Sequence, residues 1–359
     1  MTHQDPQPNL PPLRSLAHPS PPTFAVIGAG ISGLTAATAI ANQGHTVTVF
    51  DKGRGPGGRM STRREGQLRF DHGAQYFTAK DPAFAQAVAE WRRQGIVKPW
   101  NPRLAEINPD GFKMKSGGPD RFVGVPAMNA ICKHLAQSLR EPSQVRCATK
   151  VSSIRRTDQR WQLLQDGDEP LGEFDGLIIA APPPQAAALM ADAAPHLATQ
   201  ASQAVLEPCW AAMLAFDRPL FEGPPETAID GAFVNTGPLS WIARDSAKPG
   251  REPGERWIAH AGPAWSKANL ELDRQRAAEL LKQAFFEVVS VIPHARPAAP
   301  TLCIAHRWRY ALPSKPIEER CLFDPMLGLA CCGDWCAGPR VEGAFLSGEA
   351  SAGRVIRTA

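Results

Sequence analysis

Apolar residues first gather just after residue 22, where a proline-rich polar stretch gives way to the short run Phe-Ala-Val-Ile at 24–27. Such a run is typical of a buried parallel strand. Apolar positions then recur at helical spacing over residues 34–41, and Gly44 ends the pattern. Residues 46–50 predict a second strand that ends at an aspartate. The segment therefore predicts a strand–helix–strand unit of about 30 residues.

The rest of the chain alternates between strand and helix patterns. Apolar residues at helical spacing predict helices between 269 and 289 and from about 343 to 356. Further strands are expected at 160–165, 176–180, 209–216, 256–261 and 327–332. Strands that alternate with helices predict an α/β fold.

Composition narrows the class of protein. The 359 residues are 43% hydrophobic and 21% charged, which is typical of a globular chain. A net charge of +4 gives no reason to expect nucleic-acid binding, and no apolar run reaches the ~20 residues of a membrane helix. No secretory signal is recognised, so we expect a cytoplasmic protein. Residues 1–22 hold seven prolines and are predicted to be a disordered tail.

The first candidate site is the hexamer Gly-Ala-Gly-Ile-Ser-Gly at 28–33, between the first strand and the first helix. Gly28 would allow a tight turn, Gly30 would let the backbone approach a pyrophosphate, and Gly33 would allow the helix to pack on the strand. The helix N-terminus offers free N–H groups to phosphates, and Asp51 is placed to accept hydrogen bonds from ribose hydroxyls. This context predicts a dinucleotide site.

A second glycine-rich turn, residues 53–59 (Gly-Arg-Gly-Pro-Gly-Gly-Arg), follows Asp51. An ordinary NAD domain has no need of it. It resembles the second glycine motif of FAD proteins of the glutathione-reductase type, above all the amine oxidase and phytoene desaturase branch. The resemblance implies that Arg59 neutralises the FAD pyrophosphate, since its planar fork matches phosphate oxygens. A solvated surface arginine is the alternative.

Four segments together point to a narrower family: 57–63 (Gly-Gly-Arg-Met-Ser-Thr-Arg), 70–78 (Phe-Asp-His-Gly-Ala-Gln-Tyr-Phe-Thr), 333–335 (Gly-Asp-Trp) and 341–344 (Val-Glu-Gly-Ala). They resemble the renalase family, particularly its bacterial members. The resemblance runs from about residue 24 to the C-terminus and weakens in the middle third. It implies a Rossmann-like FAD-binding domain with an inserted α+β substrate domain.

The family resemblance also implies an activity. Renalase-like proteins take hydride from misreduced 2- and 6-dihydro-NAD(P) onto flavin N5, release NAD(P)⁺, and reduce O2 to H2O2. FAD would be bound noncovalently, although Cys332 and Cys336 lie near the segment through which some amine oxidases attach it. The expected cofactor-binding residues are Gly28, Gly30, Ser32, Gly33, Asp51, Lys52, Gly58, Arg59, Gly73, Ala74, Val151, Gly333, Asp334, Glu342, Gly343 and Ala344.

The same resemblance sets the expected domain organisation. The discontinuous FAD-binding domain is expected at 22–85, 145–185 and 300–359, and the substrate domain at 86–144 and 186–299. The eight cysteines are scattered and have no CxxC pair, so we expect reduced thiols and no metal site.

Hydride transfer from a dihydronicotinamide needs no general base, because the ring regains aromaticity as the hydride leaves. The catalytic candidates are therefore residues that could lie against the flavin: His72, Gln75, Tyr76 and His260. Ordinary packing remains the alternative for each. Phosphates of a dinucleotide would favour a basic entrance. The candidate substrate-binding residues are Arg63, Arg244, Trp265 and Arg309.

Other functions on the same scaffold stay open at this point. An amine oxidase commonly flanks its flavin with an aromatic pair, and only two tyrosines, Tyr76 and Tyr310, are present. A pair that uses tryptophan remains possible, although each tryptophan fits a core position equally well. A desaturase would need a long apolar channel. A flavin-binding redox protein without turnover is the non-enzymatic alternative.

Overall fold

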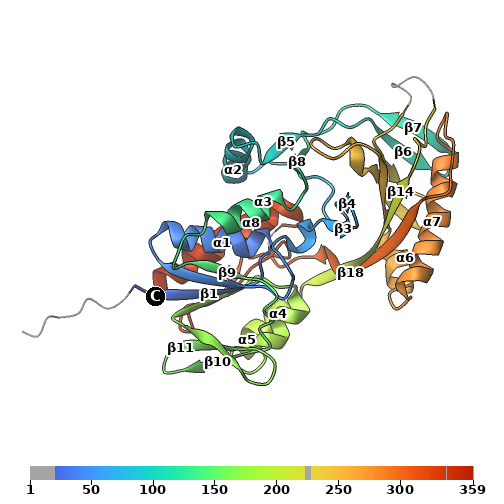
Figure 1. The fold of residues 1–359 in the computed structure, drawn as a ribbon. Helices are drawn as coiled ribbons and strands as arrows, with labels where there is room; N and C mark the ends of the chain where they lie inside the picture. Colours follow the sequence, from blue (N-terminus) through green and yellow to red (C-terminus); the bar gives the residue numbers. More distant parts are fainter. Residues whose placement is uncertain (1–20, 223–227, 337, 359) are drawn as a thin grey trace, which may run out of the picture.

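The computed structural model describes residues 21–222, 228–336 and 338–358 and consists of two units, each built on a large sheet (Figure 1). The first 20 residues of the predicted tail lie outside the described residues. No helix within the described ranges is both long enough and apolar enough to cross a membrane.

The first unit contains a six-stranded sheet in the order β19-β20-β13-β1-β2-β9, parallel except for β19. Alternate residues of β1 face opposite sides, so Phe24 and Val26 join one core while Ala25 and Ile27 join another. Both faces are therefore buried, as a parallel sheet requires. The strands are β1 (Thr23–Ile27), β2 (Thr46–Phe50), β9 (Gln144–Arg146), β13 (Gly176–Ile179), β19 (Leu322–Asp324) and β20 (Leu329–Cys331).

Helices cover one face of this sheet, and a mixed layer covers the other. Helix α1 packs against α8 and α3, and α2 packs against α8. A Cβ atom at Gly348 would lie 2.2 Å from the backbone oxygen of Ser32, so this glycine lets α8 approach α1. The helical layer comprises α1 (Ile31–Asn42), α2 (Pro82–Arg93), α3 (Ala130–Ser138) and α8 (Arg340–Val355). The opposite layer comprises β10 (Ser153–Thr157), β11 (Arg160–Leu164), β12 (Pro170–Phe174), α4 (Pro183–Met190) and α5 (Pro195–Ala201).

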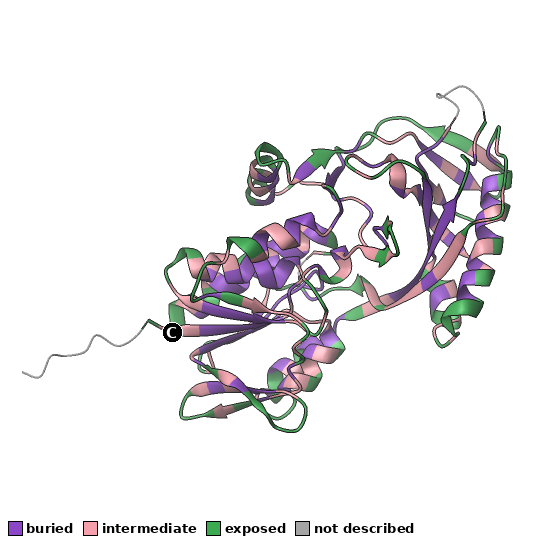
Figure 2. Cartoon of the chain, viewed as in Figure 1, coloured by how far each residue is buried: buried purple, intermediate pink, exposed green. Residues whose placement is uncertain are grey.

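The second unit contains a seven-stranded sheet in the order β18-β14-β17-β16-β15-β6-β7, antiparallel except for the pair β15 and β6. Helices α7 (Arg274–Ser290) and α6 (Pro263–Ala268) cover its outer face, and the buried strands lie inside them (Figure 2). The strands are β6 (Leu104–Asn108), β7 (Gly111–Lys115), β14 (Val205–Phe216), β15 (Gly231–Val234), β16 (Leu239–Arg244), β17 (Glu255–Ala261) and β18 (Leu302–Lys315).

Short elements lie between the two units. Phe70, at the end of β4, packs against Met213 and Ile258 of the second sheet, so the residues after β4 lie at the junction. The short strands are β3 (Arg63–Glu65), β4 (Leu68–Phe70), β5 (Val97–Pro99) and β8 (Phe122–Gly124). Single 3-10 turns occupy Gly58–Met60, Asp245–Ala247 and Ile356–Thr358.

The α/β fold expected from the sequence is confirmed, and the strand at 46–50 has the predicted bounds. Helix α7 begins later than expected, because the Asp273 side chain caps it by accepting a hydrogen bond from the Arg276 N–H at 2.9 Å. Three segments lie in the other unit from the one expected. β18 pairs with β14, α3 packs on α1, and α5 packs beneath the six-stranded sheet. Tertiary contacts decide these assignments, and the apolar pattern does not report them.

Candidate cofactor and active site

A cavity of about 2070 Å³, here called the main cavity, lies where the two units meet. Its wall includes Gly28 and Asp334 from the first unit and Trp241, His260 and Trp308 from the second. Pockets for single drug-sized ligands are about 300–1000 Å³. The main cavity therefore has room for a dinucleotide together with a second molecule.

The three glycines of the first turn have different surroundings. Gly28 has φ +113°, and a Cβ atom there would lie 2.4 Å from the Ala180 backbone oxygen. A Cβ atom at Gly33 would lie 2.0 Å from the Gly28 oxygen, so Gly33 is required for packing of α1. At Gly30 a Cβ atom would meet nothing within 4 Å. Gly30 thus leaves open space in front of the helix N-terminus, where a ligand could approach.

The start of α1 offers polar groups to the main cavity. The first backbone N–H groups of a helix have no partner within it. Ser32, in this first turn, lines the cavity, and its buried Oγ has no hydrogen-bond partner among the described residues. The Asp51 carboxylate accepts hydrogen bonds from the N–H groups of Ala29 and Gly53, both at 2.6 Å. Asp51 therefore joins the two glycine-rich turns.

Arg59 and Asp334, both predicted to bind the cofactor, form a two-point ion pair beside the main cavity. Arg59 Nη1 and Nη2 donate to the two oxygens of Asp334 at 2.9 and 2.7 Å, and Nη1 also donates to the Ala311 oxygen at 3.1 Å. Burial raises the pKa of Asp334, and Arg59 opposes that rise. The pair connects the second glycine-rich turn with the segment that precedes α8.

Most of the other predicted cofactor residues also line the main cavity. Gly33 and Gly343 are not part of its wall; a Cβ atom at Gly343 would lie 1.8 Å from the Gly338 oxygen, so this glycine serves packing. Glu342 Oε1 accepts hydrogen bonds from the N–H groups of Lys80 and Asp81 at 2.6 and 2.7 Å. The remaining lining residues of the predicted set are Lys52, Gly58, Gly73, Ala74, Val151, Gly333, Glu342 and Ala344.

Three histidines, here called the histidine cluster, surround the loop of residues 71–78 that follows β4: His72, His260 and His306. The carbonyl of His72 accepts a hydrogen bond from Trp308 Nε1 at 3.0 Å and lies 3.1 Å from His260 Nε2. The His72 ring lies 4.7 Å from the His306 ring and 4.9 Å from that of Trp308. These contacts fix the loop against β17 and β18.

The histidine cluster is uncharged at neutral pH. Burial, with added repulsion from the other two histidines, lowers the pKa of His72 to about 3. Burial likewise lowers the pKa values of His260 and His306 to about 4. The wall beside the 71–78 loop is therefore formed by neutral imidazoles and an indole.

Gln75 lines the main cavity, but its amide is already engaged. Its Nε2 donates to the carbonyl oxygens of Asp71 and Gly73, and its Oε1 accepts from Lys248 Nζ at 3.2 Å. These contacts hold the Gln75 amide within the loop, and its catalytic role stays a prediction. The neighbouring Tyr76 ring lies 5.8 Å from the Trp241 ring, and both line the cavity.

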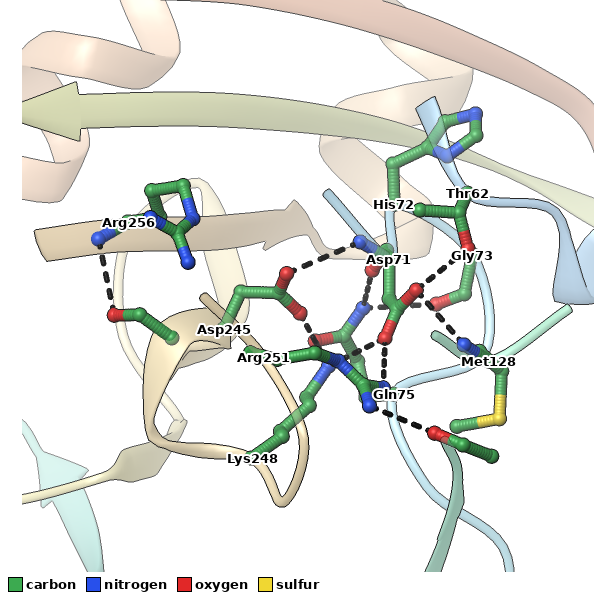
Figure 3. Close-up of polar contacts among 12 residues, drawn as sticks. Thr62, Asp71, His72, Gly73, Gln75, Met128, Asp245, Lys248, Arg251 and Arg256 are labelled. Atoms are coloured by element: carbon green, nitrogen blue, oxygen red, sulfur yellow. Dashed lines mark hydrogen bonds and ion pairs between the residues drawn. The ribbon is translucent and has the colours of Figure 1, made fainter. Parts of the chain in front are cut away.

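A buried ion network lies behind the loop and was not foreseen from the sequence (Figure 3). It consists of Asp71, Asp245, Lys248 and Arg251. Lys248 Nζ lies 2.7 Å from Asp245 Oδ1 and 3.8 Å from Asp71 Oδ2, and Arg251 donates to Asp71. The Asp71 N–H donates to Asp245 at 3.3 Å. Side chains of the second unit thus fix the first residue of the 71–78 loop.

The network balances two positive and two negative groups in the protein interior. Burial alone would raise the pKa of Asp71, but Lys248 and Arg251, with the Met128 N–H, hold that pKa below its usual value. Burial raises the pKa of Asp245, although Lys248 opposes the rise. Paired charges of this kind are tolerated only while every partner is present.

The predicted substrate residues are divided between two places. Arg63 and Arg309 line the main cavity, although Arg309 is also paired with Glu271 at 2.7 and 3.1 Å. Arg244 lies away from the cavity wall and donates to Asp230 at 2.6 Å. Trp265, on α6, packs against the core of the second unit. The structure therefore gives Arg244 and Trp265 no contact with a ligand in the main cavity.

Two segments of the chain match known protein families. Residues 26–91 match the description "NAD(P)-binding Rossmann-like domain", and residues 108–356 match "Flavin containing amine oxidoreductase". The second match spans well over half of the chain. The chain belongs to the flavin-containing amine oxidoreductase family.

Solved structures of similar fold include several oxidases. A putative protoporphyrinogen oxidase from Exiguobacterium sp. 255-15 has a TM-score of 0.71, with 14% identity over 94% of this chain and 98% of that one. Cyclohexylamine oxidase from Brevibacterium oxydans IH-35A has a TM-score of 0.70, with 13% identity over 94% and 99%. Putrescine oxidase bound to putrescine has a TM-score of 0.68, with 14% identity over 94% and 98%. At these identities the likeness is one of fold.

Among curated proteins, 4,4'-diapophytoene desaturase from Staphylococcus aureus (strain Newman) is 53% identical over 50 residues. That segment is 14% of this chain and only 10% of the desaturase. The match therefore covers about a tenth of its relative and carries no information about the rest of that protein.

The main cavity fits the flavin cofactor that the family name indicates. The open space at Gly30, the unpartnered Ser32 hydroxyl and the start of α1 suit a pyrophosphate, and Asp51 suits a ribose. Cys332 also lines the cavity, and burial raises the pKa of its thiol to about 11. A thiol that stays protonated is a poor nucleophile.

Proposed function

We propose that this member of the flavin-containing amine oxidoreductase family is an FAD-dependent oxidase whose electron donor is a 2- or 6-dihydro isomer of NAD(P). The observation that carries the proposal is the charge of the main cavity. Among the described residues that form its wall, ten are lysine or arginine and three are aspartate or glutamate. All three carboxylates already accept hydrogen bonds within the protein. Half of the ten cations are also in ion pairs: Arg59, Arg63, Lys150, Arg307 and Arg309.

A wall of this charge attracts an anion and repels a cation. A dinucleotide carries phosphates, whereas amine substrates such as putrescine are cations in solution. Among the described residues, five cations and two carboxylates of the wall form no ion pair. The resulting excess of three positive charges is larger than the two negative charges of a bound FAD pyrophosphate. The cavity therefore favours a dinucleotide donor over an amine.

The protein itself has few chemical tasks in this reaction. When bound, FAD supplies a two-electron acceptor that takes a hydride and can return electrons to O2. The 71–78 loop, His260 and Trp308 shape and close the wall where a dihydropyridine ring would lie. A positive charge develops on that ring as it becomes aromatic, and the neutral histidine cluster does not oppose it.

Oxygen consumption with a panel of donors tests the proposal. We expect uptake of O2 and formation of an equal amount of H2O2 with 2- and 6-dihydro-NAD and their NADP counterparts. Ordinary NADH is the matched control, because it has the same atoms and charge but carries its hydride at C4. Uptake with putrescine or cyclohexylamine alone would contradict the proposal and would favour an amine oxidase that uses the Tyr76 and Trp241 rings.

A further inference from the structure

A smaller pocket of about 460 Å³, here called the side pocket, lies between α7 and β18. Met213 and Ile304 contribute an apolar part of its wall, and three cations stand around it: Arg63, Arg274 and Lys282. None of the features assigned above to cofactor binding accounts for this second hollow.

The side pocket adjoins the main cavity. Arg63 and His306 belong to the wall of both. The His306 ring lies 4.7 Å from that of His72, in the loop that shapes the proposed active site. A ligand with its reactive ring in the main cavity could therefore extend past these residues into the side pocket.

The charge balance of the side pocket favours an anion. Arg274 and Lys282 are eight residues apart on α7, so they lie on the same side of the helix. Neither forms an ion pair among the residues that the structure describes, whereas Arg63 is paired with Glu65 at 3.1 Å. Glu279 is the acid in the wall, and it pairs with Arg276 at 3.3 Å.

The pKa of His306 responds to the same positive charges. Burial, together with repulsion from Arg274 and Arg63, lowers the pKa of His306 to about 4. Their positive charges therefore act on the wall that separates the two cavities. Asp273, which precedes Arg274, is occupied as the cap of α7.

We propose that the side pocket binds the phosphate-bearing adenosine end of the dinucleotide substrate, with Arg63, Arg274 and Lys282 as its contacts. This inference rests on the proposed function, since it places the far end of the same donor. Arginine is suited to the task because its planar fork matches two phosphate oxygens, and lysine adds a point charge.

The test uses the FAD-loaded protein, in which the adenine half of the main cavity is already filled. Variants R274A and K282A are compared with K267A, which removes one charge from an exposed residue of α6 away from the pocket. Each is mixed without oxygen with 6-dihydro-NAD and with 6-dihydronicotinamide riboside, which lacks phosphate. We expect R274A and K282A each to raise the Kd of the dinucleotide about five-fold, with no change for the riboside.

Equal effects on dinucleotide and riboside, or no effect on either, would overturn the inference. A second measurement separates it from the proposed function. Calorimetric titration of oxidised protein with ADP-ribose requires no hydride transfer, and we expect weaker binding to R274A and K282A than to K267A. Binding of equal strength to all three would refute the side-pocket assignment even if the dihydro isomers are oxidised. Weaker binding without oxidation would support the pocket and reject the donor.

Discussion

The buried ion network makes a quantitative prediction about stability. Replacing Lys248 with methionine removes one positive charge from the interior while keeping a side chain of similar length. In the native protein Lys248 Nζ contacts Asp245 at 2.7 Å, Asp71 at 3.8 Å and Gln75 at 3.2 Å. K248M would leave two buried carboxylates with Arg251 alone, and Gln75 would lose its donor.

The size of the effect follows from burial. The Lys248 side chain is 0% exposed and that of Asp245 is 2% exposed, so water cannot replace the lost partner. Removing one member of a buried pair costs about 3–5 kcal/mol. Burial already raises the pKa of Asp245, and losing Lys248 raises it further. A carboxyl whose pKa is raised on folding destabilises the protein above its unfolded pKa, so the loss shrinks as pH falls.

Urea unfolding followed by tryptophan fluorescence at pH 8 and pH 5.5 measures this effect. We expect K248M to lose about 3–5 kcal/mol of unfolding free energy at pH 8 and less at pH 5.5. The matched control is K248M/D245N, which removes the unpaired charge and should recover about 2 kcal/mol. The reasoning is refuted if K248M loses less than about 1 kcal/mol, or if the double variant is less stable than K248M.

Three further predictions concern the cofactor and the histidine cluster. With flavin removed from both, G30A should unfold at the wild-type urea concentration, because its new Cβ meets only open space, yet it should bind flavin far more weakly, since that space is where the ligand would approach. G28A should unfold earlier, since its Cβ would meet the Ala180 oxygen. R59A should weaken FAD binding about ten-fold or more by leaving Asp334 buried without its partner, and R59A/D334N should recover part of that loss. The rate of flavin reduction by the dihydro isomers should stay constant from pH 5.5 to 8, because the cluster has pKa values of about 3 and 4; a rise with pH through 6.5 would show a histidine acting as base.

The sequence is most informative where function depends on backbone geometry. The turn at 28–33 could be interpreted because glycines at this spacing indicate places where the backbone packs closely against another segment or a ligand. The structure shows that Gly28 and Gly33 have no room for a side chain. Asp51 and Arg59 were found for a similar reason, since each follows a recognisable strand or turn. Gly28, Asp51 and Arg59 then meet in the wall of the main cavity.

The sequence is least informative where partners are distant along the chain. Asp71 lies in the motif at 70–78, but its partner Arg251 is 180 residues away along the chain. Arg244 is the converse case. Its basic character suggested a phosphate contact, whereas Asp230 already neutralises it. Residue type alone does not reveal whether a charge is already paired.

Single-turnover reduction tests the central claim most directly. The purified yellow protein is mixed without oxygen with one equivalent of 6-dihydro-NAD, and both the flavin's visible band and the NAD⁺ released are measured. The account predicts rapid bleaching with one NAD⁺ formed per flavin, and no comparable bleaching by NADH or putrescine. Bleaching by putrescine with none by the dihydro isomer would contradict it.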